Sequence, residues 1–507
     1  MLFQQSKRMT LLVVILAVLP IVLDTTILHI AIPSLTLALQ ATGAEVLWII
    51  DIYPLLMASL LIPMGTLADR IGQRRLLCVG LFVFGIGSAG AAFSPVALVL
   101  IGARALTAVG AAMVLPCTLA VIRQTFKEDG ERATALGIWS AVGSAGAAVG
   151  PLAGGALLEH FWWGSVFLVN VPAMMLVIPL VIALIPRHTV LAKGAWKPAQ
   201  ALLLMAGLMT AVYAVKSALK AGDSIWLNAA ILVAGVGLLS WFVRIQLRSR
   251  HAMLDMSLFS KPAIRLGAVM ALVVMGALAG VELLLAQELQ FVAGKSPWEA
   301  GIFMLPLMVA AAAGGPLAGM ILNATGLRLV AGGSLAISAL SIAGLAYSDF
   351  GNAGVGVGAL LACLGLALGI GLTASSVAIM SSAPEDKAGS AGALEATSYD
   401  LGTGLGIAVF GLVMATSYQR AIRLPDGLAS EFAAKASHSI GETMLAAQSL
   451  TGEAGQGLAE AGRQAFKASH SMVLLAAAAM IGILSVVILL AFRQHPSESV
   501  SPDSHSV

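Results

Sequence analysis

Residues 139–155 read WSAVGSAGAAVGPLAGG, an apolar stretch interrupted by glycines and one proline. At 100° per residue, four of the glycines fall within about 80° of one helix face: Gly143, Gly146, Gly150 and Gly154. A glycine face lets a neighbouring backbone come close, which helices in lipid need because their apolar side chains gain little by meeting there. Pro151 removes a backbone donor and bends the helix beside this face. Two interpretations stay open, a tightly packed membrane helix or a hinge on which two helix bundles rock.

The rest of the chain has the composition of a membrane protein. Its 507 residues are 59% hydrophobic and only 10% charged, which excludes a soluble globular protein. We count fourteen apolar runs between residues 10 and 492, each about 20 residues long and able to cross a hydrocarbon core of roughly 30 Å. The first run contains Asp24 and lacks a small-residue cleavage site, so we do not expect a cleaved signal peptide. The three cysteines lie within apolar runs without pair spacing, and we expect neither a disulfide nor a metal site.

The positions of Lys and Arg predict the orientation. With the N-terminus inside, most of the 28 basic residues fall in cytoplasmic segments, so both termini are expected in the cytoplasm. The net charge of +3 reflects this asymmetry and does not indicate a nucleic-acid partner. Residues 417–468 are amphipathic and are expected to form a long outer loop whose helices lie on the bundle. Residues 493–507 are polar and Ser-rich, and we expect a disordered cytoplasmic tail.

An internal repeat predicts the domain organisation. Residues 65–74 (GTLADRIGQR) and 319–328 (GMILNATGLR) share glycines, an Asp or Asn and a final Arg at the same spacing. A helix–loop–helix repeated at this distance indicates two homologous bundles. We therefore predict an N-terminal six-helix bundle over 10–186, two inserted helices over 199–243 and a C-terminal six-helix bundle over 264–492.

The first copy of the repeat is predicted to form a loop that takes part in gating. Gly65 permits close helix contact, and Asp69 at the membrane edge is placed to cap a neighbouring helix N-terminus through its dipole. Arg70 marks the loop as cytoplasmic. Gly72 recurs in the second copy as Gly326.

Two charged residues lie at similar depth in the first and fourth apolar runs. Asp24 is about eight residues from the outer end of its run, so roughly 12 Å deep at 1.5 Å per residue. A carboxylate at such a depth costs about 2.5–3.5 kcal/mol, so it should face protein or water. Arg104 lies at the same estimated depth, and the two are predicted to pair or to share water. Either they form a coupling site or they are a permanent structural ion pair. His29 is expected to cap or pack near the interface.

Further acids lie in other apolar runs. Asp51 is about one turn inside the outer surface, shallow enough to be wetted, and Glu282 is expected near that surface. Glu395 is predicted one turn in from the cytoplasm and Asp400 near mid-membrane. These two project about 140° apart, so they do not face one point. Tyr399 shares a face with Glu395 and is placed to hydrogen-bond it.

Three motifs together resemble a known family: LDTTILHIAIP at 23–33, GTLADRIGQRR at 65–75 and VGPLAGG at 149–155. They are similar to signatures of the fourteen-helix drug:proton antiporters of the major facilitator superfamily, and closest in pattern to quaternary-ammonium and methyl viologen exporters. The resemblance covers about residues 10–492. It implies an all-α integral membrane protein with two six-helix bundles related by a pseudo-twofold axis, plus two inserted helices. It also implies membrane acids at four positions of this chain: Asp24, Asp51, Glu395 and Asp400.

The chain departs from the family pattern in three places. After Arg104 the family usually has Gln-Gly, where this chain has Thr107-Ala108. The family's W-R-W becomes Trp163-Gly164-Ser165. Some relatives carry an acid near Ala311, which this chain lacks, and Glu282 is expected to compensate.

The function expected from these features is proton-driven export of lipophilic organic cations of the quaternary ammonium, biguanide, viologen or dye type from a bacterial inner membrane. Buried carboxylates hold either a proton or a cation, and competition between the two is the simplest coupling. The expected partners are cationic drugs and biocides, protons and the bilayer. We expect a monomer without cofactor or metal.

Two other function classes make different demands on the sequence. A proton-coupled metabolite transporter on the same fold would have fewer membrane acids and a cavity with inward Arg or Lys, and only Arg104 fits. A membrane enzyme or sensor would need a metal cluster, a nucleophile motif or a soluble catalytic domain, and none is visible. There is also no Gly-Lys-Ser/Thr motif for ATP, which argues against a primary pump.

Overall fold

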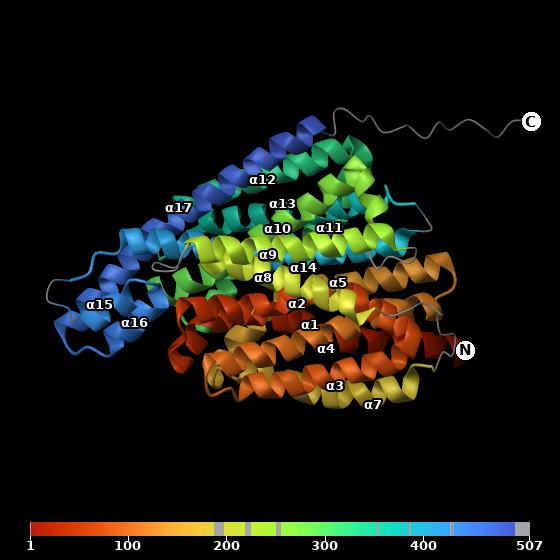
Figure 1. Cartoon of the computed structure of the whole chain (residues 1–507), viewed down its shortest axis with the longest axis horizontal. Helices are drawn as coiled ribbons and strands as arrows, with labels where there is room; N and C mark the ends of the chain where they lie inside the picture. Colours follow the sequence, from red (N-terminus) through yellow and green to blue (C-terminus); the bar gives the residue numbers. More distant parts are fainter. Residues whose placement is uncertain are drawn as a thin grey trace, which may run out of the picture.

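The computed structural model describes residues 2–186, 197–217, 225–249, 255–351, 354–384, 387–425, 428 and 430–491, and within these ranges its regular secondary structure is entirely helical (Figure 1). The first part of the chain forms α1 (Leu2–Leu39), α2 (Gly43–Ile71), α3 (Gln73–Ala92), α4 (Ala97–Thr125), α5 (Asp129–His160), α6 (Ser165–Leu168) and α7 (Asn170–Leu184). Next come α8 (Pro198–Ser217), α9 (Ile225–Arg248) and the 3₁₀ turn η1 (Met256–Ser260). The remainder forms α10 (Pro262–Gln287), the π-helical turn η2 (Glu288–Val292), α11 (Pro297–Thr325), α12 (Leu327–Ala346), α13 (Val355–Met380), α14 (Ala388–Ala421), α15 (Ser430–Ala436), α16 (Ile440–Gln448) and α17 (Glu453–Ala491).

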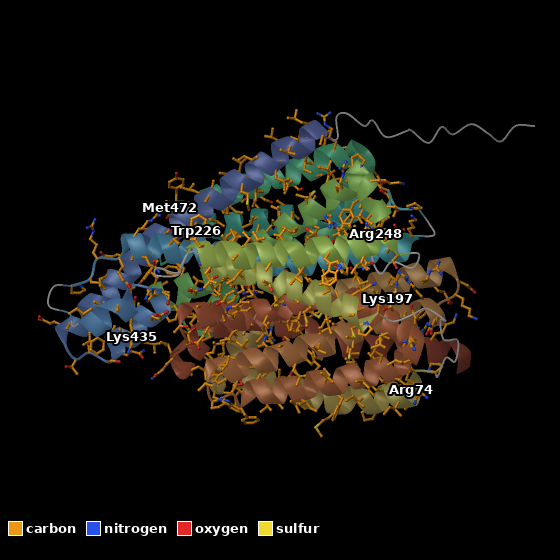
Figure 2. The ribbon with its side chains drawn as sticks, in the orientation of Figure 1. Arg74, Lys197, Trp226, Arg248, Lys435 and Met472 are labelled. Atoms are coloured by element: carbon orange, nitrogen blue, oxygen red, sulfur yellow. The ribbon has the colours of Figure 1, made fainter. Side chains whose placement is uncertain are left out.

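Within the described residues, 14 helices are long and apolar enough to cross a membrane, which confirms the predicted all-α membrane fold. The long helices run side by side, with α15 and α16 at one end, called here the hairpin end (Figure 1). Helix α1 begins and α17 ends at the opposite end, called here the termini end. Three basic residues, Arg74, Lys197 and Arg248, lie toward the termini end (Figure 2).

The internal repeat is visible residue for residue. Helices α2 and α3 have the same lengths as α11 and α12, 29 and 20 residues, and their bounds differ throughout by the same offset. Each pair begins with a capping box, Thr42 with Glu45 and Ser296 with Glu299. Such boxes satisfy the free amides at a helix start. The two copies therefore start their first helix with the same chemistry.

The turn inside each copy is also the same. Gly72 has φ 94° and Gly326 has φ 79°, a region that side chains disfavour, so each glycine allows a sharp break between two helices. The Arg two residues later holds the last helix of its own half. Arg74 donates to the carbonyl of Ile182 in α7, and Arg328 donates to the carbonyl of Leu489 in α17 at 2.8 Å.

Two of the buried apolar clusters each lie mostly within one half. One apolar cluster draws on α1–α5 and α7, and another is centred on α10–α13 and α17. Helix α8 packs against α9 and also contacts α2 and α14. The inserted pair thus lies beside a junction between the halves, while the assignment of 10–186, 199–243 and 264–492 as functional units stays a prediction.

The segment over 417–468, expected as a long outer loop whose helices lie on the bundle, is largely helical. Helix α14 continues to Ala421, and α17 begins at Glu453 and runs unbroken into its membrane span. An apolar run marks only the part of a helix that crosses lipid, so the runs do not show that α14 and α17 continue beyond it. Between them lie α15 and α16, and α16 packs on α17 and contacts α1. The tail over 493–507 lies outside the described residues.

Candidate transport site

Asp24 and Arg104 meet in the interior of the N-terminal half. Arg104 Nη1 donates to Asp24 Oδ2, and both residues are only 1% exposed. Asn170 Nδ2 donates to the other carboxylate oxygen at 3.1 Å and contacts Ser88 Oγ at 3.4 Å. Both carboxylate oxygens are therefore occupied, as a buried charge requires. Asn170 was missed as a partner, although it stands in the F-x-x-N-x-P motif that the sequence contains.

Arg104 also faces two aromatic rings. Its guanidinium carbon lies 4.5 Å from the centre of the Tyr53 ring and 5.7 Å from that of Phe167, distances typical of cation–π contacts. Tyr53 interacts electrostatically with Asp24, Arg104 and Asp400. Its buried hydroxyl has no hydrogen-bond partner among the described residues. Tyr53 therefore lies within the electrostatic influence of both Asp24 and Asp400.

The acids of α14 have a different environment. Tyr399 Oη donates to Glu395 Oε1 at 2.7 Å, which confirms the predicted contact along one helix face. Asp400 is partly exposed, and in the described part of the chain no cationic side chain lies within ion-pair distance of Asp400 or Glu395. These two carboxylates have no resident counter-ion there.

Asp51 is not wetted as predicted. It is 0% exposed, and its carboxylate lies 2.5 Å from the Lys216 ammonium of α8. Sequence reasoning missed Lys216 because it stands at the end of an apolar run where a base is ordinary. Nothing in the spacing indicates that the inserted helix reaches back to α2.

Glu282 is buried inside the protein, near the end of α10. It is 3% exposed, and its Oε2 lies 3.6 Å from Nε2 of His29, which is itself buried. His29, expected to cap or pack near the interface, packs in the protein interior beside Glu282. Because Glu282 is on α10 and His29 on α1, this contact joins the two halves.

The glycine face of α5 packs on α1. A Cβ at Gly150 would overlap the Thr26 hydroxyl, and a Cβ at Gly154 would come within 3.2 Å of Ile27. Gly146 lies similarly close to Leu19. Gly143 does not belong to this contact, because a Cβ there would meet nothing within 4 Å. The hinge role of this face stays a prediction.

The other side of α5 meets the second half of the molecule. A Cβ at Gly301 of α11 would lie 2.7 Å from the Pro151 carbonyl oxygen, and one at Gly155 would lie 2.8 Å from that of Pro297. Pro151 therefore stands where α5 touches both α1 and α11. A Cβ at Gly404 of α14 would likewise crowd Leu55 of α2.

Further contacts between the halves lie at the hairpin end. There the Gly43 amide donates to Glu442 at 2.7 Å, and Gln290 donates to the Ile30 carbonyl at 3.0 Å. At the termini end, the described ion pairs stay within one half, such as Lys387 with Asp255 at 2.8 Å. Hydrogen bonds from Lys387 and Ser257 lower the pKa of the partly exposed Asp255 to about 2. The halves are thus joined at the hairpin end.

Comparison with known proteins decides the family. The model of the Major Facilitator Superfamily matches residues 14–407. The chain belongs to the major facilitator superfamily. It is therefore a membrane transporter and not an enzyme, and the predicted family resemblance is confirmed.

Relatives within the superfamily are resistance and efflux proteins. The chain is 48% identical over 478 residues to the methyl viologen resistance protein SmvA of Salmonella typhimurium, covering 94% of this chain and 97% of that protein. It is 36% identical over 491 residues to the multidrug efflux pump LfrA of Mycolicibacterium smegmatis, covering 93% and 95%. These relatives support drug efflux by this chain.

A solved structure shares the fold. A bacterial homolog of the human lysosomal transporter Spinster, in an inward-facing and unoccupied conformation, aligns with a TM-score of 0.69 at 18% identity. The alignment covers 96% of this chain and 98% of that one.

The superfamily loop between α2 and α3 lies at the termini end. A Cβ at Gly65 would lie 3.6 Å from Pro116 of α4, so this glycine is in ordinary contact rather than a close approach. Asp69 does not cap α3, which has no side-chain cap, and instead accepts from Gln73 Nε2 at 3.4 Å. Arg70 is exposed, and Gly72 supplies the sharp turn. A role of this loop in gating stays a prediction.

Proposed function

We propose that this transporter exports lipophilic organic cations across a bacterial inner membrane in exchange for protons, by alternating access. Cationic drugs and biocides, protons and the bilayer are its partners, and it acts as a monomer without a cofactor. Both termini are placed in the cytoplasm, so that the hairpin end faces outward. Contacts at the hairpin end close that side, so a substrate would enter from the cytoplasm or the inner leaflet.

One observation carries the proposal. In the described residues no cationic side chain lies within ion-pair distance of Asp400, which we place near mid-membrane, and the charges of both Asp400 and the paired Asp24 act on Tyr53. A carboxylate in such a place has to bind something, because an uncompensated charge inside a membrane is costly. A proton and an organic cation are alternatives at this position. Their competition would drive exchange.

Transport by everted membrane vesicles tests this function. Vesicles with the parent protein should take up ethidium when respiration acidifies their interior, and a protonophore should abolish the uptake. Vesicles with the Asp400→Asn variant at equal abundance serve as the control and should show no uptake above background. Uptake that persists after the proton gradient is collapsed would contradict proton coupling. Failure to transport any of several lipophilic cations would contradict the substrate class.

A further inference from the structure

The Lys216 ammonium occupies a pocket built like a binding site for a cation. Besides the Asp51 carboxylate at 2.5 Å, its Nζ lies 3.1 Å from the Leu47 carbonyl oxygen. The centre of the Trp48 ring is 4.1 Å from the same nitrogen. Tyr213 stands beside the indole, with its ring centre 6.3 Å away and an interplanar angle of 31°. A carboxylate, a carbonyl and two aromatic rings are the groups that recognise organic ammonium ions.

A cavity adjoins this pocket. Its volume is about 620 Å³, it lies near the hairpin end, and it is lined by Trp48, Tyr213 and Lys216 together with residues of α1, α2, α8, α10, α14, α16 and α17. Asp51 does not line it. The lysine side chain therefore stands between the cavity and the buried carboxylate. Ligand pockets of this size are typical for drug-sized molecules.

From this geometry we propose that the pocket around the Lys216 ammonium is a binding site for lipophilic organic cations on their way out, and that Lys216 closes it until such a cation displaces the lysine. The inference rests on the proposed export of cations. It gives the inserted helix α8 a role in transport, because this helix carries a tethered cation that competes with the substrate.

The charges explain why a tethered cation would be useful. Asp51 is fully buried, and removing the partner of a buried charge is strongly destabilising. A second cation is therefore the natural replacement for Lys216. When the substrate leaves, the lysine returns and Asp51 is again neutralised without a proton from outside. The competition also weakens retention of substrate, since apparent affinity falls with the fraction of sites that are free.

Chemical labelling of the parent protein tests the displacement directly. Purified protein is treated with a lysine-acylating reagent with and without saturating tetraphenylphosphonium, and modification is read by mass spectrometry. Bound cation should raise the acylation rate of Lys216 several-fold, because the ammonium is released from Asp51. Lys127, which is exposed at the termini end, is the internal control and should not change. An unchanged or lower rate at Lys216 would overturn the proposal.

Binding measurements on variants give a second test. Removing the competing cation with Lys216→Met should lower the dissociation constant for tetraphenylphosphonium by about tenfold. The matched change Lys127→Met at the exposed surface should leave the dissociation constant unaltered. Adding Asp51→Asn to Lys216→Met should return the dissociation constant to the parent value or above it. Unaltered or weaker binding by a monodisperse Lys216→Met protein would contradict the proposal, and if that variant does not fold, the labelling result decides.

The outcomes separate this inference from the proposed function. If the parent protein does not bind tetraphenylphosphonium, the proposed cation export fails and this inference fails with it. If the parent binds and transports the cation while Lys216 stays unreactive, only this inference is overturned.

Discussion

The central acids of the two halves, Asp24 and Asp400, differ in burial and in their partners. In the N-terminal half, Asp24 is buried and bonded to Arg104 and Asn170 through both carboxylate oxygens. In the C-terminal half, Asp400 is partly exposed, with no cationic side chain beside it among the described residues. A charge with fixed partners is held in one state, whereas a charge without them is free to exchange its partner. We infer that Asp24 anchors its half and that Asp400 carries the exchange.

The inserted helices extend this contrast. Asp51 also belongs to the N-terminal half, and its counter-ion comes from α8. Asp24 and Asp51, the two buried acids discussed for this half, are thus each ion-paired with a cationic side chain. The repeat gives α2 and α11 the same length but does not give the halves the same charges. The positions at the same offset from Asp24 and Asp51 are the apolar Leu278 and Leu305.

The largest effect is expected from Asp24→Asn. The change leaves Arg104 buried with an amide in place of a carboxylate, and breaking a buried pair costs about 3–5 kcal/mol. Thermal unfolding in detergent should occur at clearly lower temperature than in the parent, and export of all cations should be lost. Adding Arg104→Gln should restore part of the stability but no export. Normal unfolding of the single variant would show that the pair is not an anchor.

The Asp400→Asn change should abolish export while leaving the stability of the protein nearly unchanged. Export of mono- and dications should be abolished because the exchange site is gone. The folding free energy should change by no more than about 0.5 kcal/mol, since no charged partner is left behind. Parallel vesicle transport and thermal unfolding of the same preparation measure both. A loss of stability as large as that of Asp24→Asn would remove the contrast between the halves.

Gly301→Ala should disturb a contact between the two halves. Gly150→Ala should disturb a contact within the N-terminal half. The added methyl at Gly301 would press on the Pro151 carbonyl and weaken closure at the hairpin end, while that at Gly150 would press on Thr26 inside the N-terminal half. Cysteines placed at the hairpin end should therefore become more accessible to a membrane-impermeant thiol reagent in Gly301→Ala only. Equal labelling of both alanine variants would contradict the distinction.

If α5 is a hinge, the Gly150→Leu variant is expected to insert into the membrane but not to transport.

The smallest and most selective effect is expected from two glutamates. Expelling a dication against an inside-negative potential costs about 2.3 kcal/mol per charge per 100 mV, so it needs more protons or carboxylates than a monocation. Glu395→Gln and Glu282→Gln should impair dication export several-fold more than monocation export. Susceptibility and transport assays with methyl viologen and ethidium compare the two classes. Equal losses for both would disprove the selectivity.

Much of the fold was predictable because its signals are local. Apolar runs locate the spans, and the glycine and arginine spacing at 65–74 and 319–328 locates the repeat. The contact between Asp24 and Arg104 followed from equal depth along two helices. That between Tyr399 and Glu395 followed from helical spacing.

The unpredicted part of the site depends on how distant elements pack. Lys216 and Asp51 meet only because the inserted α8 lies against α2, and no period in the sequence encodes that contact. The same holds for His29 and Glu282, which meet across the junction of the halves. Gly143 shares the sequence pattern of its neighbours, but α1 does not reach it.

Proton release on cation binding tests the exchange at Asp400 most directly. Purified protein in weakly buffered solution with a pH indicator is mixed with tetraphenylphosphonium. At saturating cation, the parent should release about one proton per protein molecule. The Asp400→Asn variant should release no proton. Because the paired Asp24 contributes no proton, an Asp24→Asn/Arg104→Gln protein that binds the cation should still release one. Undiminished release from Asp400→Asn would contradict the assignment of the exchange to the C-terminal half.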